Sequence, residues 1–73
     1  MATPPGKLIG DEVRELRERY GLAQHEVAAA WGRPQSNLSV IEHNKRAVSA
    51  YTEKLIKAAI RRLAEEKRIG DHV

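Results

Sequence analysis

Residues 24–41, QHEVAAAWGRPQSNLSVI, have the spacing of two short helices that cross around a tight turn. Ala28 is small enough to let the second helix approach closely, and Gly32 can adopt the left-handed conformation that such a turn requires. This pattern predicts a helix-turn-helix, an arrangement typical of proteins that bind DNA. Four side chains should then point inward together: Val27, Trp31, Leu38 and Ile41.

Catalytic chemistry is not predicted for this chain. The sequence has no nucleophile with a base partner, no phosphate-binding glycine loop and no carboxylate pair. His25, His43 and His72 lack the spacing of metal ligands, so they are better interpreted as surface histidines than as a zinc site. We therefore predict a protein that is not an enzyme, with no metal, cofactor or small-molecule ligand.

The length of 73 residues allows one domain with one small core. No window approaches the roughly 18 apolar residues of a membrane span, and the start MATPPG lacks the apolar run of a signal peptide. These features predict a cytoplasmic protein. Because the chain has no cysteine, packing and dimerisation must supply the stability that disulfides give other small domains.

Basic residues are unevenly distributed along the chain, whose formal net charge is +3. Residues 1–32 carry four basic and five acidic side chains, whereas residues 33–62 carry seven basic side chains against two acidic ones. An excess that begins at the predicted turn is typical of a surface that faces phosphates, although a solvated face is the alternative. The basic side chains are Arg33, Lys45, Arg46, Lys54, Lys57, Arg61 and Arg62.

Helical periodicity predicts an all-α domain of four helices, or five if the last one is broken near its end. Residues 1–7 are expected to form a flexible arm, because two prolines and a glycine offer no periodicity. Leu8 and Ile9 should pack just ahead of the first helix, which Asp11 caps and Gly21 ends. The other helices are predicted at residues 23–31, 34–43 and 50–68.

The ends of the last two helices have recognisable boundary residues. Asn44 can take the left-handed conformation that stops the third helix, and Ser49 can cap the fourth. We expect a single domain over residues 8–69, followed by a short tail over residues 70–73. The apolar stripe of the last helix consists of Leu55, Ile56, Ala59, Ile60 and Leu63.

The run GDEVRELRERYGLAQ from Gly10, then Ala28 and Gly32, and the run IEHNKR from Ile41 resemble the Cro/cI-type (XRE) repressors. The match covers roughly residues 10–49. The resemblance implies a compact bundle of four to five helices of the lambda-repressor-like DNA-binding type, with the helix-turn-helix at helices 2 and 3. It also implies a buried, structural ion pair between Arg17 and Glu42.

The resemblance further implies that the third helix lies in the major groove of double-stranded DNA, with its early residues facing base edges. Gln35 occupies the family position that contacts a base, and a glutamine can bond both N6 and N7 of adenine. Ser36 and Ser39 carry hydroxyls that suit a base or a phosphate, and Val40 can touch a thymine methyl. Asn37 can face either way.

Phosphate contacts are expected from groups that flank this helix. The family uses the glutamine at the position of Gln24 on phosphate, and the backbone N–H groups beside it suit an anion. Asn44, Lys45 and Arg46 are expected to form the other clamp. The two cations could equally be solvated loop charges.

The turn departs from the family pattern. Arg33 and Pro34 stand where the family prefers a small apolar residue and then a serine or threonine cap. Pro34 is therefore expected at the first position of the helix. Arg33 has the chemistry to reach either a phosphate or a guanine.

The last helix is predicted to be longer than a small four-helix core needs, about 27 Å for some 18 residues. We expect a two-fold homodimer through this helix, which would place two recognition helices about 34 Å apart on a palindromic site. The alternative is that its end bends back over its own core or frays. The interface residues would be Ile60, Leu63, Ala64 and Ile69.

Two classes of function follow from these patterns. The first is a transcriptional regulator of bacterial or phage type, most simply a repressor, that binds a palindromic operator as a dimer. The alternative is a protein-interaction module on the same scaffold, such as an antitoxin or a repressor antagonist, in which the last helix carries the activity. The absence of acidic residues around Gln35, Ser36 and Ser39 favours the first class.

Overall fold

The computed structural model describes residues 6–71, with side chains through residue 68. It contains four helices, α1 (Gly10–Arg19), α2 (Gln24–Trp31), α3 (Gln35–Glu42) and α4 (Ala50–Asp71). Within the described residues the only extended pairing is an isolated bridge, so the all-α prediction is confirmed. The four-helix prediction agrees with this count, and the alternative of a break near the end of the last helix is excluded, because α4 runs unbroken for 22 residues. None of the described helices is long and apolar enough to cross a membrane.

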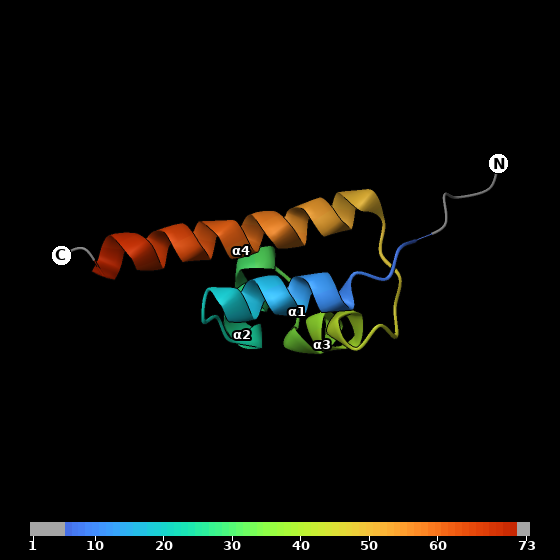
Figure 1. Ribbon diagram of the computed structural model, residues 1–73. Helices are drawn as coiled ribbons and strands as arrows, with labels where there is room; N and C mark the ends of the chain where they lie inside the picture. The colour runs from blue at the N-terminus through green and yellow to red at the C-terminus, as the bar shows by residue number, and fades with distance from the viewer. Residues whose placement is uncertain (1–5, 72–73) are drawn as a thin grey trace.

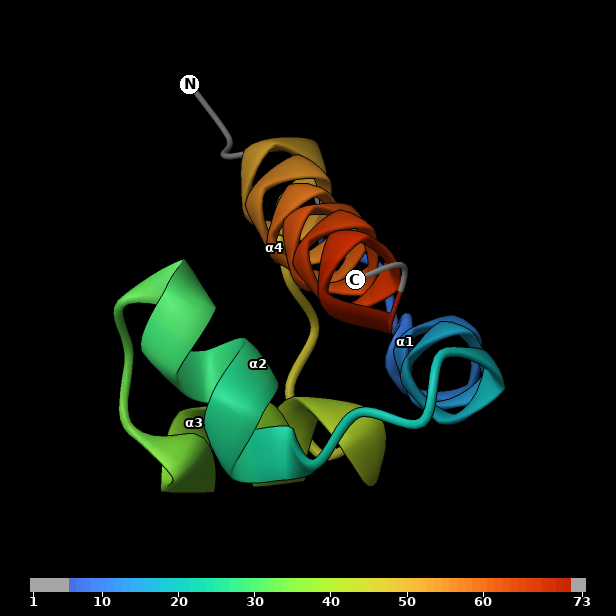
Figure 2. The same cartoon turned by 90° about the vertical axis from the view of Figure 1, so that its left-hand side faces the viewer.

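The four helices form a stack in which α1 and α2 lie between α3 and α4 (Figure 1). Figure 2 looks along α1 and α4, which run side by side, while α2 and α3 pack together next to them. The outer surface of α3 therefore faces away from α4. This arrangement leaves one complete side of α3 open to solvent.

Each helix contributes side chains to one core, which supplies most of the stability of so small a domain. Val13 from α1, Val27 from α2 and Leu38 from α3 are fully buried, and Ile56 and Ile60 from α4 close the core. The predicted inward positions of Val27, Leu38 and Ile41 are confirmed. Trp31 lies only partly buried at the edge of the core.

The predicted burial of one residue in the apolar stripe of α4 is wrong. Leu55 remains 39% exposed, whereas Ile56, Ala59 and Ile60 are buried and Leu63 packs partly against the core. Leu55 lies at the edge of the contact between α2 and α4, where it lines a hollow together with Ala30 and Trp31.

Left-handed residues end α2 and follow α3, as predicted. Gly32 has φ 85° directly after α2, and Asn44 has φ 58° two residues after α3. Ser49 accepts the backbone N–H of Thr52 at 3.2 Å and so caps α4, which is also confirmed. Pro34, however, has ψ 148° and precedes the first helical residue Gln35, so its predicted place inside the helix is wrong.

The start of α1 differs from the prediction. Asp11 lies inside the first turn and does not cap it. The backbone N–H of Gly10 instead donates to Oδ1 of Asn44 at 2.9 Å, a contact 34 residues away in sequence. A Cβ at Gly10 would lie 2.5 Å from the carbonyl oxygens of both Ile41 and Glu42. Glycine is therefore required here because the end of α3 abuts the start of α1.

The segment before α1 is partly ordered against the loop that follows α3. Lys7, which we expected in a flexible arm, exchanges two backbone hydrogen bonds with Val48 at 2.9 and 3.0 Å. Ile9 is buried as predicted, but Leu8 is 56% exposed and does not pack. The first five residues of the predicted arm lie outside the described residues.

Candidate nucleic-acid interface

The outer face of α3 is polar and accessible over its first turn. Leu38, Ile41 and Glu42 form the buried side of the helix, and Gln35 and Ser36 are exposed on the other. The remaining predicted base-contacting residues, Asn37, Ser39 and Val40, are half-buried. Val40 packs partly against the core, which limits the part of its side chain that a ligand could touch.

A bidentate ion pair joins α1 to the end of α3. Nε and Nη2 of Arg17 donate to the two carboxylate oxygens of Glu42 at 2.7 and 2.9 Å, and Nη1 donates to the Leu22 carbonyl at 2.9 Å. The Glu42 side chain is only 2% exposed. Hydrogen bonding to Glu42 raises the pKa of Arg17 above its ordinary value, although burial opposes the shift. The predicted buried pair is confirmed.

Gln24 extends this pair to the surface. Its Nε2 donates to Oε1 of Glu42 at 3.0 Å, and its Oε1 accepts from Nε2 of Gln35 at 3.4 Å. Arg17, Glu42, Gln24 and Gln35 thus form one continuous chain of polar contacts, which we call the polar chain. Sequence reasoning assigned Gln24 to phosphate and missed its contact with Gln35. One N–H of the Gln24 amide remains for an external acceptor.

Asn44 has a structural role that was not predicted. Its Oδ1 accepts the Gly10 N–H and its Nδ2 donates to Oδ1 of Asp11 at 3.3 Å. Both ends of this side chain therefore contact α1. The predicted phosphate contact of Asn44 stays a prediction, because its exposed amide keeps one N–H for an external acceptor.

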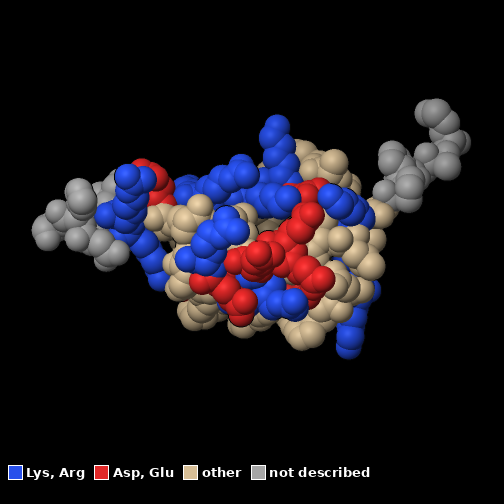
Figure 3. Space-filling view, in the orientation of Figure 1, with Lys and Arg blue, Asp and Glu red and all other residues tan. Residues whose placement is uncertain are grey.

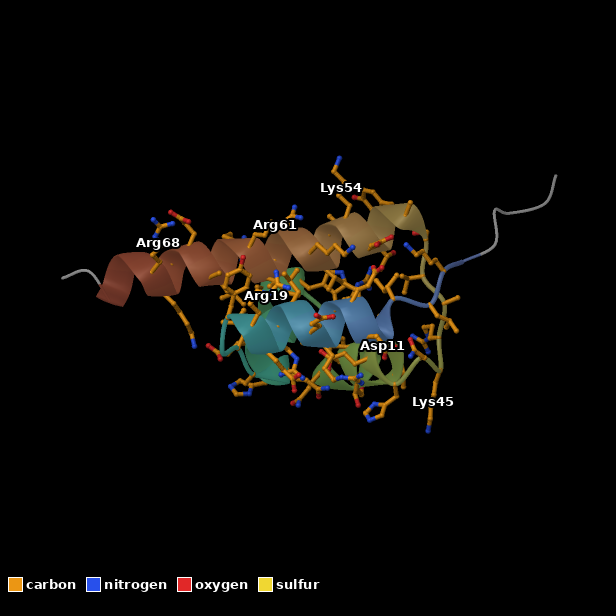
Figure 4. The ribbon with its side chains drawn as sticks, viewed as in Figure 1. Asp11, Arg19, Lys45, Lys54, Arg61 and Arg68 are labelled. Atoms are coloured by element: carbon orange, nitrogen blue, oxygen red, sulfur yellow. The ribbon has the colours of Figure 1, made fainter. Side chains whose placement is uncertain are left out.

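Three cations near α3 are exposed, namely Arg33, Lys45 and Arg46. Figure 4 shows Lys45 pointing away from α4, beyond the end of α3. Arg33 and Arg46 line a common hollow of about 350 Å³ beside α3, which we call the Arg33–Arg46 hollow. None of the three forms an ion pair with another described side chain.

The basic residues between 33 and 62 do not form one surface. Lys54 and Arg61 project from the side of α4 that faces away from α3 (Figure 4). Nζ of Lys57 forms ion pairs with Oε2 of Glu53 at 2.7 Å and Oε2 of Glu12 at 3.2 Å. The prediction of a single phosphate-facing surface from the local charge excess is therefore wrong. The fold distributes these cations over opposite faces of the molecule.

Acidic side chains make the side of α1 unsuitable for a polyanion. Figure 3 shows them gathered over α1, where Asp11, Glu12, Glu15 and Glu18 are exposed. Like charges repel a phosphate backbone, so a duplex could not lie against this side. The outer face of α3, with Lys45 at its end, is the polar surface that remains compatible with such a ligand.

His43, which the sequence analysis interpreted only as a surface histidine, lies at the end of the outer face of α3. It is exposed, and its Nδ1 lies 2.7 Å from the carbonyl oxygen of Ser39. A carbonyl can only accept, so Nδ1 carries the proton and Nε2 presents a lone pair to solvent in the neutral ring. The spacing Ser36, Ser39, His43 follows one helical face, and that periodicity was the available signal.

The predicted dimer surface on α4 requires a correction. Ile60 is 0% exposed within its own domain and cannot contact a second copy. Leu63 and Ala64 are half-buried, and the Ile69 side chain lies outside the described side chains. Among the described side chains of α4, the large apolar ones that are exposed are Tyr51 at 70% and Leu55 at 39%.

The chain matches no family model, no curated protein and no solved structure. The resemblance to Cro/cI-type repressors therefore depends on the residues quoted above. The structure independently gives an all-α fold of four described helices.

Proposed function

We propose that the protein is a sequence-specific regulator that binds double-stranded DNA by placing α3 in the major groove. The observation that carries this proposal is the polar chain. It links the exposed Gln35 at the start of α3 to a buried ion pair, so that a side chain able to recognise a base is supported from within the fold. A contact made by a pre-positioned side chain loses less conformational entropy on binding.

The contact with Gln24 leaves Gln35 with the groups that adenine recognition needs. One N–H of the Gln35 amide donates to Gln24, and the second N–H and the carbonyl oxygen remain. These two groups match N7 and the N6 amino group of adenine in the major groove. Ser36 lies beside Gln35 on the exposed surface, with Ser39 and Val40 one turn further along α3.

Phosphate groups on the two sides of the groove would be held by different parts of the domain. Gln24, with its remaining N–H and the start of α2, faces one strand. Arg33 supplies a cation before the start of α3, and Lys45 and Arg46 supply cations after its end. Such contacts fix the position of the helix without selecting bases.

We propose further that the regulator is a cytoplasmic homodimer of the Cro/cI-type that represses transcription by occupying a palindromic operator. Two recognition helices about 34 Å apart would contact successive turns of the duplex. With Ile60 buried, the exposed Tyr51 and Leu55 of α4 replace it as the apolar contribution to the two-fold contact. Such a protein needs no cofactor and performs no catalysis.

One observation favours the protein-interaction alternative. A shallow hollow of about 210 Å³ between α2 and α4 is mostly apolar and carries one cation; it is lined by Ala30, Trp31, Leu55, Ala58, Ala59 and Arg62. Apolar surface of this kind is common where small proteins bind a partner. An antitoxin or a repressor antagonist would use this side of the molecule and leave the outer face of α3 free.

The proposal is tested by selecting duplexes from a random library with the full chain, followed by fluorescence anisotropy across a salt series. We expect a palindromic site and an affinity that falls steeply with salt. Gln35→Ala should relax one base position and leave the salt slope unchanged, whereas Lys54→Ala on the far side of α4 should alter neither. Weak, unselective binding by the wild type would contradict the proposal and favour the protein-interaction alternative.

A further inference from the structure

The Arg33–Arg46 hollow lies beside α3 where three parts of the chain meet. Arg33 comes from the turn after α2, Asn37 from α3, and Arg46 from the loop that leads to α4. Trp31, Ile41 and Val48 provide apolar lining. No acidic residue lines it among the described residues.

The charges around this hollow are not balanced within the protein. Two guanidinium groups line one small space and neither forms an ion pair with a described side chain. Like charges that share one space repel each other, and both arginines are exposed, so an external anion can reach the two of them. An anion bound between them would offset the repulsion and would be attracted by both cations.

The other polar groups of the hollow determine which donors are available to an anion bound by the two arginines. The hydroxyls of Ser49 and Thr52 also line the hollow, but Ser49 Oγ donates to Thr52 Oγ1 at 3.2 Å and accepts the Thr52 N–H. The hydroxyl hydrogen of Ser49 is therefore used, whereas that of Thr52 remains. The side-chain donors that remain are the two guanidinium groups, the Asn37 amide and the Thr52 hydroxyl.

We propose that Arg33, Arg46 and Asn37 form a single site for one phosphate group, and that its occupant is one phosphodiester of the bound duplex. Arginine forks bind phosphate oxygens in pairs, and a tetrahedral phosphate has enough oxygens for two forks and an amide. This inference rests on the proposed function. It also gives a role to Arg33, which the family resemblance left unexplained.

The position of the site explains why one phosphate would matter for recognition. Arg33 precedes α3 and Arg46 follows it, so a phosphate bound by both is tied to the two ends of the same helix. Gln24 lies at the start of α2 and can hold the backbone elsewhere. A fixed distance between a bound phosphate and Gln35 would set the register of α3 along the groove.

The number of phosphates neutralised can be counted from the salt dependence of duplex binding. The slope of log affinity against log salt changes by about 0.9 for each phosphate contacted. Removing both cations of one shared site should lower the slope by about 0.9, whereas two separate sites would lower it by about 1.8. Arg33→Gln, Arg46→Gln and the double variant provide the comparison, with Lys54→Gln as a matched control on the opposite side.

Neutral methylphosphonate linkages, placed one at a time in the selected duplex, locate the phosphate. We expect one linkage that weakens wild-type binding roughly tenfold, as for loss of hydrogen bonds to a charged group, and that has no further effect on the double variant. Each single variant should weaken binding, and their effects should be strongly non-additive. Additive losses, a slope change near 1.8 or two sensitive linkages would overturn the shared site.

Titration with inorganic phosphate separates this inference from the proposed function. NMR of the full-length wild type should show the Arg33 and Arg46 Nε–H signals shifting together, with the double variant and Lys54→Gln as controls for the assignment. If the protein selects no duplex but both signals shift, the phosphate site stands and its occupant is a free phosphate compound. If neither duplex nor phosphate perturbs the pair, the site is overturned.

Discussion

Two polar clusters join α1 to its neighbours, and they differ in how far solvent reaches their charges. The α1–α3 junction contains Gly10, Arg17, Glu42 and Asn44, and its ion pair is 14% and 2% exposed. The α1–α4 cluster contains Lys7 and Glu12, which are 63% and 51% exposed, and Lys57 and Glu53, which are 27% and 18% exposed. Solvent therefore screens the charges of the cluster more than the buried pair of the junction.

The difference matters because the junction supports the candidate interface and the cluster does not. Glu42 accepts from Arg17 and from Gln24, and Gln24 in turn contacts Gln35. No member of the α1–α4 cluster touches a residue of the outer face of α3 in any described contact. Breaking the junction should thus affect both stability and binding.

The largest effect is expected for Arg17→Ala, which leaves the Glu42 carboxylate buried without its main partner. Loss of one member of a buried pair typically costs about 3–5 kcal/mol. Urea unfolding followed by circular dichroism would measure this loss in the free energy of unfolding. Arg62→Ala on α4 removes an exposed pair with Glu66, away from the junction, and should cost far less. Equal losses for the two variants would show that the junction is not special.

A smaller loss of stability is expected for Gly10→Ala. The added Cβ would meet two carbonyl oxygens of α3 at 2.5 Å, so α1 must move away from α3. Overpacking of this kind typically costs about 1–3 kcal/mol. Gly21 is not a matched control because its φ is positive. The comparison is with Ala29→Gly at an exposed position of α2, which should cost about 1 kcal/mol through helix propensity alone.

Gln24→Ala tests the connection between the junction and the interface. It removes one of the hydrogen bonds to Glu42, which should cost on the order of 1 kcal/mol of stability. Duplex affinity should fall as well, and selectivity at the base contacted by Gln35 should relax, as measured by anisotropy on matched and mismatched duplexes. Unchanged selectivity would mean that Gln24 does not orient Gln35.

The smallest effect is expected for the α1–α4 cluster, and it should depend on pH. Hydrogen bonding to Lys57 lowers the pKa of Glu53, so this stabilisation is present above the ordinary glutamate pKa and is lost as pH falls through the lowered value. Hydrogen bonding to Glu53 raises the pKa of Lys57, so its stabilisation is lost as pH rises through the raised value.

Lys57→Met should therefore change urea stability only slightly between these limits, and the change should shrink further in high salt because solvent screens the cluster. At both pH extremes the wild type and the variant should converge. A large, salt-independent loss at neutral pH would place this cluster in the same class as the junction.

Local residues predicted the helices well because helix boundaries depend on short-range chemistry. The left-handed conformations of Gly32 and Asn44 and the cap at Ser49 needed only the residue type and its neighbours. Asp11 does not cap α1 because the helix begins one residue earlier, at Gly10, whose backbone N–H donates to Asn44 34 positions further along the chain. Leu55 and Ile60 were misjudged because periodicity shows that a stripe exists but not how wide its partner is.

The candidate site was predicted in part. The Arg17–Glu42 pair came from the family motif, and the exposure of Gln35 and Ser36 agrees with their expected place on the outer face of α3. The contact from Gln24 to Gln35, the use of Asn44 by α1 and the shared hollow of Arg33 and Arg46 were not foreseen. Each joins residues from different helices or from the loops between them.

The sequence by itself determined the all-α class, the tight turn between α2 and α3, and which residues were available for polar contacts. These features follow from helical periodicity and from the φ angles that glycine and asparagine allow. Only the tertiary structure decided which polar groups are occupied internally and which cations share a space. Those outcomes depend on how α1 and α2 are held between α3 and α4, and contacts across that packing have no signature in the local order of residues.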